Sequence, residues 1–339
     1  MTVYFIGWYG QRNSGDESFK LAHRALFPGE HIEWLTTAAL PQIGKGDVVV
    51  LGSGDVLRDF YLRLIPDGVK YFVYGVGADG QADLDVAVAQ KERIIAGWFR
   101  NYGDVEYLRA HGVHAHYTPD IVFQLAPPEN GLAIPSSPQP RKTMTCFFSN
   151  DTSQYALETA DLNLFARTYT QKREIAQSLD QLSPYYNFRF VPFSFAWNAY
   201  DLSFAVDVFA MMKRRENVKI VEEELAFDQV MYEVSTSHVV VSMKFHGLIY
   251  AVLAKRPFVN IGLTHKTQQF CLEAGLEELS VSPIAFTAEK FLTSLKIAEA
   301  PKTLEKVVEV SAKYRANAVD AGMQFAESLN RHRTSQLDL

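Results

Sequence analysis

The sequence predicts an α/β protein made of two Rossmann-like domains. Short apolar runs alternate with helical segments along the chain, which is typical of parallel sheets covered by helices. Glycine-rich turns follow three of the early apolar runs, at Gly7–Gly10, Gly52–Gly54 and Gly75–Gly77. At 339 residues the chain is also long enough for two domains of about 150 residues each.

The first domain is expected at residues 1–130. Its parallel strands are predicted from five short apolar runs, at Val3–Gly7, Ile32–Leu35, Val48–Leu51, Tyr71–Tyr74 and Ile94–Phe99. Helices are predicted between them, at Glu17–Leu26, Val56–Leu64, Leu84–Glu92 and Val105–His111. Five prolines in the stretch from Ala126 to Arg141 predict a linker.

The second domain is expected at residues 131–300. Its strands are predicted at Met144–Ser149, Phe188–Pro192, Val218–Ile220, His238–Ser242 and Phe258–Ile261. Its helices are predicted at Tyr155–Leu179, Asp201–Lys213, Ala226–Val234, Leu248–Ala254 and Thr267–Ala274.

A last amphipathic helix is predicted at residues 301–330, beginning with Pro301. Its inner face is expected to contain Leu304, Val307, Val308, Val310 and Ser311, and the helix is expected to reach back and pack on the first domain. Two Rossmann-like domains and such a helix make the two-lobed, GT-B-like architecture of many glycosyltransferases, whose active site is the cleft between the lobes.

The composition restricts the class of partner and the location. A chain with 47% hydrophobic and 21% charged residues is that of a globular protein, and a net charge of −6 argues against nucleic acid as a partner. The two cysteines, Cys146 and Cys271, are too few for a disulfide framework or a structural zinc site and are expected to be buried. Because the start lacks the pattern of a signal peptide and no window reaches about 20 apolar residues, we predict a cytoplasmic location.

The segment from Ser242 to Gly247 is the most informative part of the sequence. It follows the β-branched run Val239–Val241 and leads into an apolar helix, so Lys244 and His246 are predicted at the carboxyl edge of a sheet. Open α/β sheets bind their ligands at this edge. A cation and an imidazole there suggest an anionic substrate beside a group that transfers protons.

Four segments occur in an order that a known family shares. They are Gly7–Glu17, Leu51–Asp59, Trp98–Leu108 with the following Gly112–Asp120, and Ser242–Gly247 with the residues that follow it up to Phe270. With these segments the chain resembles the polysaccharide pyruvyl transferases over nearly its whole length. Two departures concern the site: Lys244 stands where the family has arginine, which loses the bidentate fork, and the Gly52–Asp55 turn has fewer glycines.

The resemblance implies an enzyme that transfers the pyruvyl group of phosphoenolpyruvate to two hydroxyls of a sugar as a cyclic ketal. It implies an acceptor site on the first domain and a donor site on the second. The acceptor would be a bacterial surface polysaccharide or its precursor, and a lipid-linked oligosaccharide is one candidate. No metal-binding pattern or cofactor motif occurs in the sequence, and the reaction is expected to need neither.

Eight residues are predicted to form the site. His246 and Asp16 are the candidate catalytic residues, and Arg100, Lys244 and Lys266 are the candidate donor ligands. Asn13, Gly15 and Glu17 are the candidate acceptor ligands.

For several of these residues a structural role stays open. Arg100 ends an apolar strand and therefore needs an anionic partner, which could be Asp104 or Asp120 instead of the donor. Acidic residues such as Asp16 and Glu17 are also favourable in the first turn of any helix. His246 could be a buried histidine bonded to the backbone, and Lys266 a solvated lysine.

Other functions and partners also stay open. A nucleotide-sugar glycosyltransferase is one alternative, with Glu222–Glu224 available to bind a ribose, and a non-catalytic glycan-binding protein is another. The basic run Lys213–Arg215 either ends a helix or contacts an anionic membrane face, which would place the protein at the inner surface of the cell membrane. A homo-oligomer is compatible with the sequence and stays an open alternative.

Overall fold

The computed structural model describes residues 1–38, 40–126, 141–150, 156, 160–196, 200–262, 264–282 and 285–337. The chain forms two compact units. The first consists of Met1–Gln11, Asp16–Leu125 and Lys313–Leu339, and the second of Arg12–Gly15 and Ala126–Ala312. Most of the predicted proline-rich linker lies outside the described residues.

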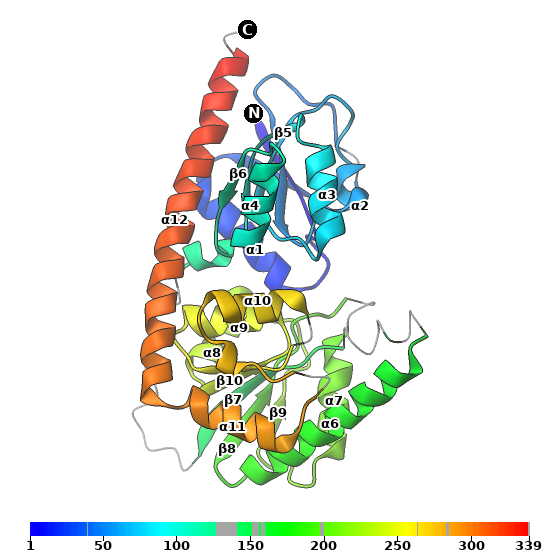
Figure 1. The fold of residues 1–339 in the computed structure, drawn as a ribbon, viewed down its shortest axis with the longest axis vertical. Helices are drawn as coiled ribbons and strands as arrows, with labels where there is room; N and C mark the ends of the chain where they lie inside the picture. The colour runs from blue at the N-terminus through cyan, green and yellow to red at the C-terminus, as the bar shows by residue number, and fades with distance from the viewer. Residues whose placement is uncertain are drawn as a thin grey trace. The chain divides into compact units, whose positions relative to one another are not determined.

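The first unit contains a six-stranded parallel sheet in the order β2-β1-β3-β4-β5-β6. Figure 1 labels two of its neighbouring strands, β5 and β6. Its strands are β1 (Thr2–Ile6), β2 (His31–Leu35), β3 (Val48–Gly54), β4 (Tyr71–Val76), β5 (Ile94–Phe99) and β6 (Ala115–Tyr117). Its helices are α1 (Ser14–Leu26), α2 (Asp59–Leu62), α3 (Gln81–Ala89) and α4 (Tyr102–Ala110), with the short η1 (Ile121–Gln124) after β6.

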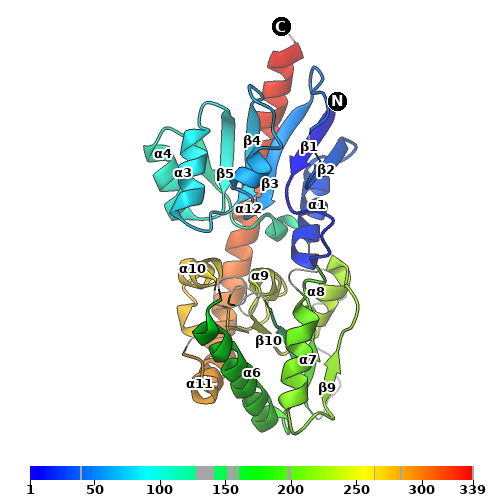
Figure 2. The ribbon, with the colours of Figure 1, turned by 90° about the vertical axis from the view of Figure 1, so that its right-hand side faces the viewer.

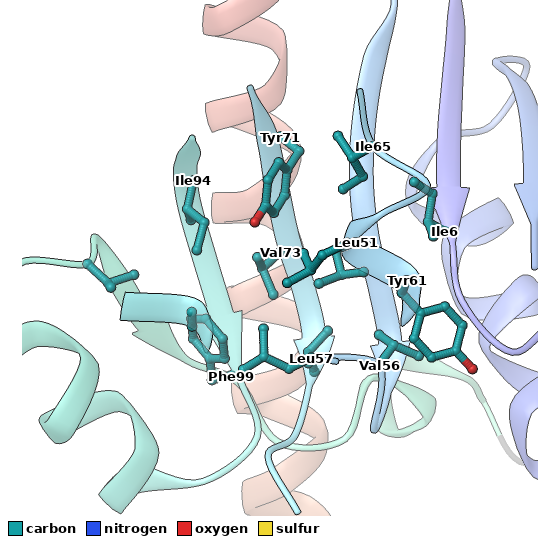
Figure 3. Close-up of a cluster of buried hydrophobic side chains, with 14 of the residues drawn as sticks. Ile6, Leu51, Val56, Leu57, Tyr61, Ile65, Tyr71, Val73, Ile94 and Phe99 are labelled. Carbon is teal, nitrogen blue, oxygen red and sulfur yellow. The ribbon is translucent and has the colours of Figure 1, made fainter. Parts of the chain in front are cut away.

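Alternation along the strands of this unit produces two apolar faces. Tyr71 and Val73 of β4 belong to a core that α2, α3 and α4 cover, and ten of its side chains are labelled in Figure 3. Tyr74 points to the opposite face, where its ring stacks on Phe325 at a centroid distance of 4.1 Å. Since both faces are buried there, the inner strands β1, β3, β4 and β5 are apolar almost throughout, whereas the edge strands β2 and β6 include His31, Glu33 and His116.

The second unit contains a five-stranded parallel sheet in the order β11-β10-β7-β8-β9. Its strands are β7 (Lys142–Phe147), β8 (Tyr186–Phe190), β9 (Val218–Ile220), β10 (Val239–Ser242) and β11 (Phe258–Asn260). Figure 2 shows α6 and α7 beside each other, and α8, α9 and α10 form another group. The helices are α6 (Leu162–Leu182), α7 (Asp201–Met211), α8 (Phe227–Ser235), α9 (Phe245–Leu253), α10 (His265–Glu273) and α11 (Ala288–Ala298), with η3 (Glu277–Leu279) after α10.

The last helix, α12 (Pro301–Leu337), is longer than predicted and contributes to both units. Its buried residues include Val307, Val310 and Ser311, as predicted. The assignment of Leu304 and Val308 to the inner face is wrong, because these side chains are 41% and 40% exposed. Helical periodicity places them on the flank of the buried stripe, and their apolar character alone could not show this.

The structure corrects the predicted elements at a few places. The helix predicted at Val56–Leu64 is shortened to the four residues of α2. Strand β6 and helix α11 were not among the elements predicted from periodicity. Helix α9 begins at Phe245, three residues before the predicted start, so His246 belongs to its first turn.

Candidate functional site

The strand order of the second unit places Lys244 and His246 at the expected edge of the sheet. The order in which strands are added to this parallel sheet changes direction between β7 and β10, because β8 lies on one side of β7 and β10 on the other. Such a switch point opens a crevice at the carboxyl ends of the strands, where ligands bind in open α/β sheets. Lys244 and His246 follow the carboxyl end of β10.

The turn from β10 into α9 is held by Ser242 and Gly247. The Ser242 hydroxyl accepts a hydrogen bond from the Lys244 N–H at 3.0 Å and donates one to the Lys244 carbonyl at 2.7 Å. A Cβ atom at residue 247 would lie 2.2 Å from Ser242 Oγ, so only glycine allows α9 to start this close to the strand. The turn therefore fixes the backbone from which both candidate residues extend.

Lys244 has a carboxylate partner in the second unit. Its ammonium lies 3.2 Å from Oδ1 of Asp201, a side chain that is fully buried at the start of α7. The Lys244 side chain is only 13% exposed. The cation is thus part of the packed edge of the sheet. Asp201 lies 43 residues away along the chain, so no local pattern in the sequence points to it as the partner of Lys244.

Residues Arg12–Gly15 pack with the second unit although the rest of the N-terminal sequence forms the first. Asn13 makes an antiparallel bridge with Ser194, and the Ser14 N–H donates to the Phe193 carbonyl at 2.9 Å. The Tyr250 hydroxyl of α9 donates to the Ser14 carbonyl at 3.2 Å. These contacts bring two predicted acceptor ligands, Asn13 and Gly15, to the same unit as His246.

Gly15 lies directly against the imidazole of His246. A Cβ atom at residue 15 would lie 2.3 Å from His246 Nδ1, which is far inside van der Waals contact. Asn13 caps α1, since its Oδ1 accepts a hydrogen bond from the Gly15 N–H at 3.1 Å. The glycine at this position is therefore explained by the close approach of the histidine ring.

We expect Gly15→Ala to displace the His246 ring and to lower activity more than stability. The added methyl group must push the ring aside, and overpacking of this kind typically costs about 1–3 kcal/mol. Turnover and urea unfolding of the variant check this expectation. Gly103→Ala in α4 is the matched control, because a Cβ atom there meets nothing within 4 Å. Equal turnover of Gly15→Ala and the unmutated protein would contradict the tight contact.

Lys266 lies in the first turn of α10, next to the end of β11. The turn after β11 is close to the turn after β10, because a Cβ atom at Gly262 would lie 2.7 Å from the Met243 carbonyl oxygen. Lys244, His246 and Lys266 therefore belong to neighbouring turns at one edge of one sheet. An anion at this edge would also meet backbone N–H groups at the start of α10.

Arg100 lies in the first unit and is engaged by two carboxylates. Its guanidinium contacts Asp55 at 2.5 Å and Asp120 at 3.1 Å, and its side chain is 6% exposed. Burial alone would lower the pKa of Arg100, but the charges of Asp55 and Asp120 outweigh burial and raise it above its ordinary value. The structural alternative, an ion pair with Asp120, is thus present in the structure, and donor binding by Arg100 stays a prediction.

Asp16 and Glu17 also lie in the first unit, in the first turn of α1. Glu17 accepts a hydrogen bond from the Gly10 N–H at 2.5 Å and pairs with Lys20 at 2.6 Å. Asp16 Oδ1 would lie 3.4 Å from a Cβ atom at Gly54, so its carboxylate is at the end of β3. The order in which strands are added to the sheet of this unit changes direction between β1 and β3, because β2 lies on one side of β1 and β3 on the other. Asp16 lies at this topological switch point.

His23 is a buried, neutral histidine in the first unit, and it predicts a pH dependence of stability. Its ring stacks on Phe5 and its Nε2 lies 2.9 Å from the Ser53 hydroxyl. Burial lowers the pKa of His23 to about 3. The unfolded chain binds a proton at this histidine near pH 6.5, and the folded chain does not. The stability that the neutral His23 contributes is therefore complete above about pH 6.5 and is lost as the pH falls toward about 3.

We expect the free energy of unfolding to fall by about 2 kcal/mol between about pH 7 and about pH 5 through His23 alone. Urea unfolding at both pH values, compared between the unmutated protein and His23→Gln, isolates this contribution. The glutamine variant should lose less stability on acidification. An identical loss in both proteins would show that His23 does not remain neutral when the chain is folded.

His238 and the basic run Lys213–Arg215 make contacts that stabilise the fold. His238 Nδ1 accepts a hydrogen bond from the Thr143 N–H at 2.9 Å, which is the role of a strand-end histidine. In the basic run, Arg215 donates to the Met212 carbonyl at 2.7 Å and to the Ala210 carbonyl, at the end of α7. Such contacts satisfy carbonyls at a helix C-terminus.

The described residues contain neither a cluster that could bind a metal nor a helix that could span a membrane. There, no group of three or more His, Cys, Asp or Glu side chains could hold a metal ion. None of the helices in the described part of the chain combines the length and the hydropathy that a bilayer span requires. Both cysteines are free and buried, as predicted.

Comparisons with known proteins identify the family and the fold. The family model for polysaccharide pyruvyl transferase matches residues 11–265. No curated protein matches the sequence significantly.

Among solved structures, a putative UDP-N-acetylglucosamine 2-epimerase from Listeria monocytogenes is 11% identical with a TM-score of 0.58, over 98% of this chain and 97% of that one. UDP-GlcNAc 2-epimerase from Neisseria meningitidis is 11% identical with a TM-score of 0.55, over 98% and 100%. The glycotransferase of kitacinnamycin is 10% identical with a TM-score of 0.51, over 97% and 98%. At these identities the matches concern the fold alone, and they confirm the predicted GT-B-like class with two Rossmann-like domains.

Proposed function

Because the chain belongs to the polysaccharide pyruvyl transferase family, we propose that it transfers the pyruvyl group of phosphoenolpyruvate to a sugar as a cyclic ketal and releases phosphate. The sugar is part of a bacterial surface polysaccharide or of its precursor. The observation that carries the proposal is the position of Lys244 and His246 at the switch point of the second sheet. A lysine that could bind an anion and a histidine that could transfer protons follow the same strand end, which suits a donor of this chemistry.

The proposed reaction uses both hydroxyls of an acceptor diol. The first hydroxyl adds to C2 of phosphoenolpyruvate while C3 gains a proton and becomes a methyl group. The C2–O bond to phosphate then breaks, phosphate leaves with the electron pair, and the second hydroxyl adds to the oxocarbenium-like C2. The proton of the first hydroxyl balances the one gained by C3, and the proton of the second leaves with phosphate.

The chemistry assigns a role to each group at the edge of the second sheet. His246 is the proposed acid/base, since an imidazole titrates near neutral pH. Lys244 and Lys266 are the proposed ligands of the phosphate and carboxylate of the donor. Arg100 would have to share its guanidinium with Asp55 and Asp120, so we place it after the two lysines in this role.

On the acceptor side, Asn13, Gly15, Asp16 and Glu17 remain the proposed ligands of the sugar. Asn13 and Gly15 are supported by their packing against the unit that holds His246. Asp16 is supported by its place at the switch point of the first sheet, from which a carboxylate could accept a proton or a hydrogen bond from a hydroxyl.

A nucleotide-sugar donor is less compatible with the cavity beside Glu222 and Glu223. Glu222 and Glu223 line a cavity of about 730 Å³ along β9 and α8, together with Asp228, Glu233 and Lys219. A nucleoside diphosphate placed there would meet the carboxylates of Glu222, Glu223 and Asp228 and one lysine, while Glu233 is paired with Arg189 at 2.8 Å. This charge balance disfavours the ribose-binding role considered for Glu222–Glu224.

Phosphate release tests the proposal. Phosphoenolpyruvate is supplied with candidate sugars, nucleotide sugars are run in parallel, and products are identified by mass spectrometry. Phosphate release that depends on the sugar, with a pyruvyl ketal on the product, is the expected result. Release of a nucleoside diphosphate without uptake of pyruvate would establish the glycosyltransferase instead, and absence of both reactions would favour a glycan-binding protein.

A further inference from the structure

Asp201 connects the central strands of the second sheet at the edge that carries the proposed site. Its side chain is fully buried. Oδ2 accepts a hydrogen bond from the Ser194 N–H at 2.9 Å, after β8, and Oδ1 accepts one from the Asn150 N–H at 3.3 Å, after β7. Oδ1 also lies 3.2 Å from the ammonium of Lys244, after β10.

A carboxylate in this position must be compensated, because an isolated buried charge is very unfavourable. The two backbone N–H groups hold the carboxylate in place, and the ammonium of Lys244 compensates its charge. The geometry therefore makes Asp201 a fixed anchor on the framework of the sheet. Lys244, by contrast, extends on a flexible four-carbon stem.

We propose that Asp201 is a positioning residue of the donor site, which acts by holding the Lys244 ammonium at the carboxyl edge of the sheet. The proposal rests on the proposed function for the identity of the donor. Lysine lacks the planar fork of arginine, so the orientation of the Lys244 side chain depends on a neighbouring group. The Asp201 carboxylate provides this orientation. The same carboxylate favours the protonated form of Lys244, which the binding of an anion requires.

Other charged groups on neighbouring elements are His246 on α9 and Lys266 on α10. Both can be cationic, and like charges would disfavour the protonated form of Lys244. Asp201 opposes their effect. Removing its charge should therefore weaken the binding of phosphoenolpyruvate most at high pH, where Lys244 is closest to losing its proton.

Calorimetric titration with phosphoenolpyruvate from about pH 7 to about pH 10 tests this inference on the full chain. Asp201→Asn should bind about tenfold more weakly at neutral pH, as for the loss of one charged contact, and weaker still as the pH rises. The double variant Asp201→Asn with Lys244→Arg should recover affinity at high pH, since a guanidinium stays charged. A purely structural role for Asp201 would give no recovery.

The matched control is Asp207→Asn. Asp207 lies on the same helix and also pairs with a lysine, Lys172 at 2.7 Å, but its side chain is 51% exposed. Its replacement should leave donor affinity unchanged at every pH. If Asp201→Asn matches the unmutated protein in affinity and pH profile, the inference is overturned.

A measurement without donor separates this inference from the proposed function. Acetylation of Lys244 by acetic anhydride at about pH 8, followed by peptide mass spectrometry, should be slower than that of the exposed Lys302 and faster in Asp201→Asn. If phosphoenolpyruvate does not bind the unmutated protein, the proposed function fails while this result still decides the role of Asp201. Should the variant not fold, equal acetylation of Lys244 and Lys302 in the unmutated protein would itself contradict a fixed ammonium.

Discussion

Replacing His246 with alanine is expected to abolish pyruvyl transfer while leaving the binding of phosphoenolpyruvate largely intact. Loss of a general acid/base typically lowers the rate by about 10²–10⁴-fold. The imidazole is well placed for this function, because it belongs to the first turn of α9 at the switch point and packs against Gly15. The donor should still bind through the lysines at the same edge.

Steady-state kinetics and calorimetry on His246→Ala measure the two effects separately. His31→Ala is the control, since His31 is exposed on β2 in the first unit, where it pairs with Glu33. Its replacement should change neither turnover nor affinity. A His246 variant with weak donor affinity and near-normal turnover would assign the histidine to binding instead of catalysis.

Lys244 and His246 could be located from the sequence because the signal is local. A β-branched run followed at once by an apolar helix defines a strand end, and the residues between them must lie at the edge of the sheet. Asp201 and Asp55 could not be found in this way. Each reaches its partner only through the order of strands in the sheet, and that order is set by packing between distant segments.

The segment Arg12–Gly15 illustrates the same limit. Its glycine and asparagine suggest a turn before a helix, which is what the first domain was expected to contain. Its backbone instead forms a bridge with Ser194, and Gly15 packs against the ring of His246. Both contacts join residues about 180 or more positions apart. The need for glycine at residue 15 therefore becomes clear only once the histidine is in place.

Arg100→Met is expected to cause the largest loss of stability of any single substitution considered for this protein. It removes the guanidinium but leaves Asp55 and Asp120 in place, and the side chain of Asp120 is fully buried. Removal of one partner of a buried ion pair typically costs about 3–5 kcal/mol, because the remaining charge has no compensation. Methionine keeps the length and the packing of the stem, so the loss reports mainly on charge.

Urea unfolding followed by tryptophan emission is a suitable measurement, since Trp8, Trp34 and Trp98 all belong to the first unit. Arg58→Met is the control. Arg58 pairs with Asp79 at 3.1 Å, but both side chains are about half exposed, and exposed pairs contribute about 0–1 kcal/mol. Adding Asp120→Asn to Arg100→Met should restore part of the stability, because the amide carries no charge.

Donor binding by the folded Arg100 variant then decides between the two roles that the sequence leaves open. If Arg100 only neutralises Asp55 and Asp120, calorimetry on Arg100→Met below its unfolding temperature should show unchanged affinity for phosphoenolpyruvate. If the guanidinium also contacts the donor, affinity should fall even in the stabilised Arg100→Met, Asp120→Asn double variant. A stability equal to that of the unmutated protein would contradict the buried ion pairs of Arg100 with Asp55 and Asp120.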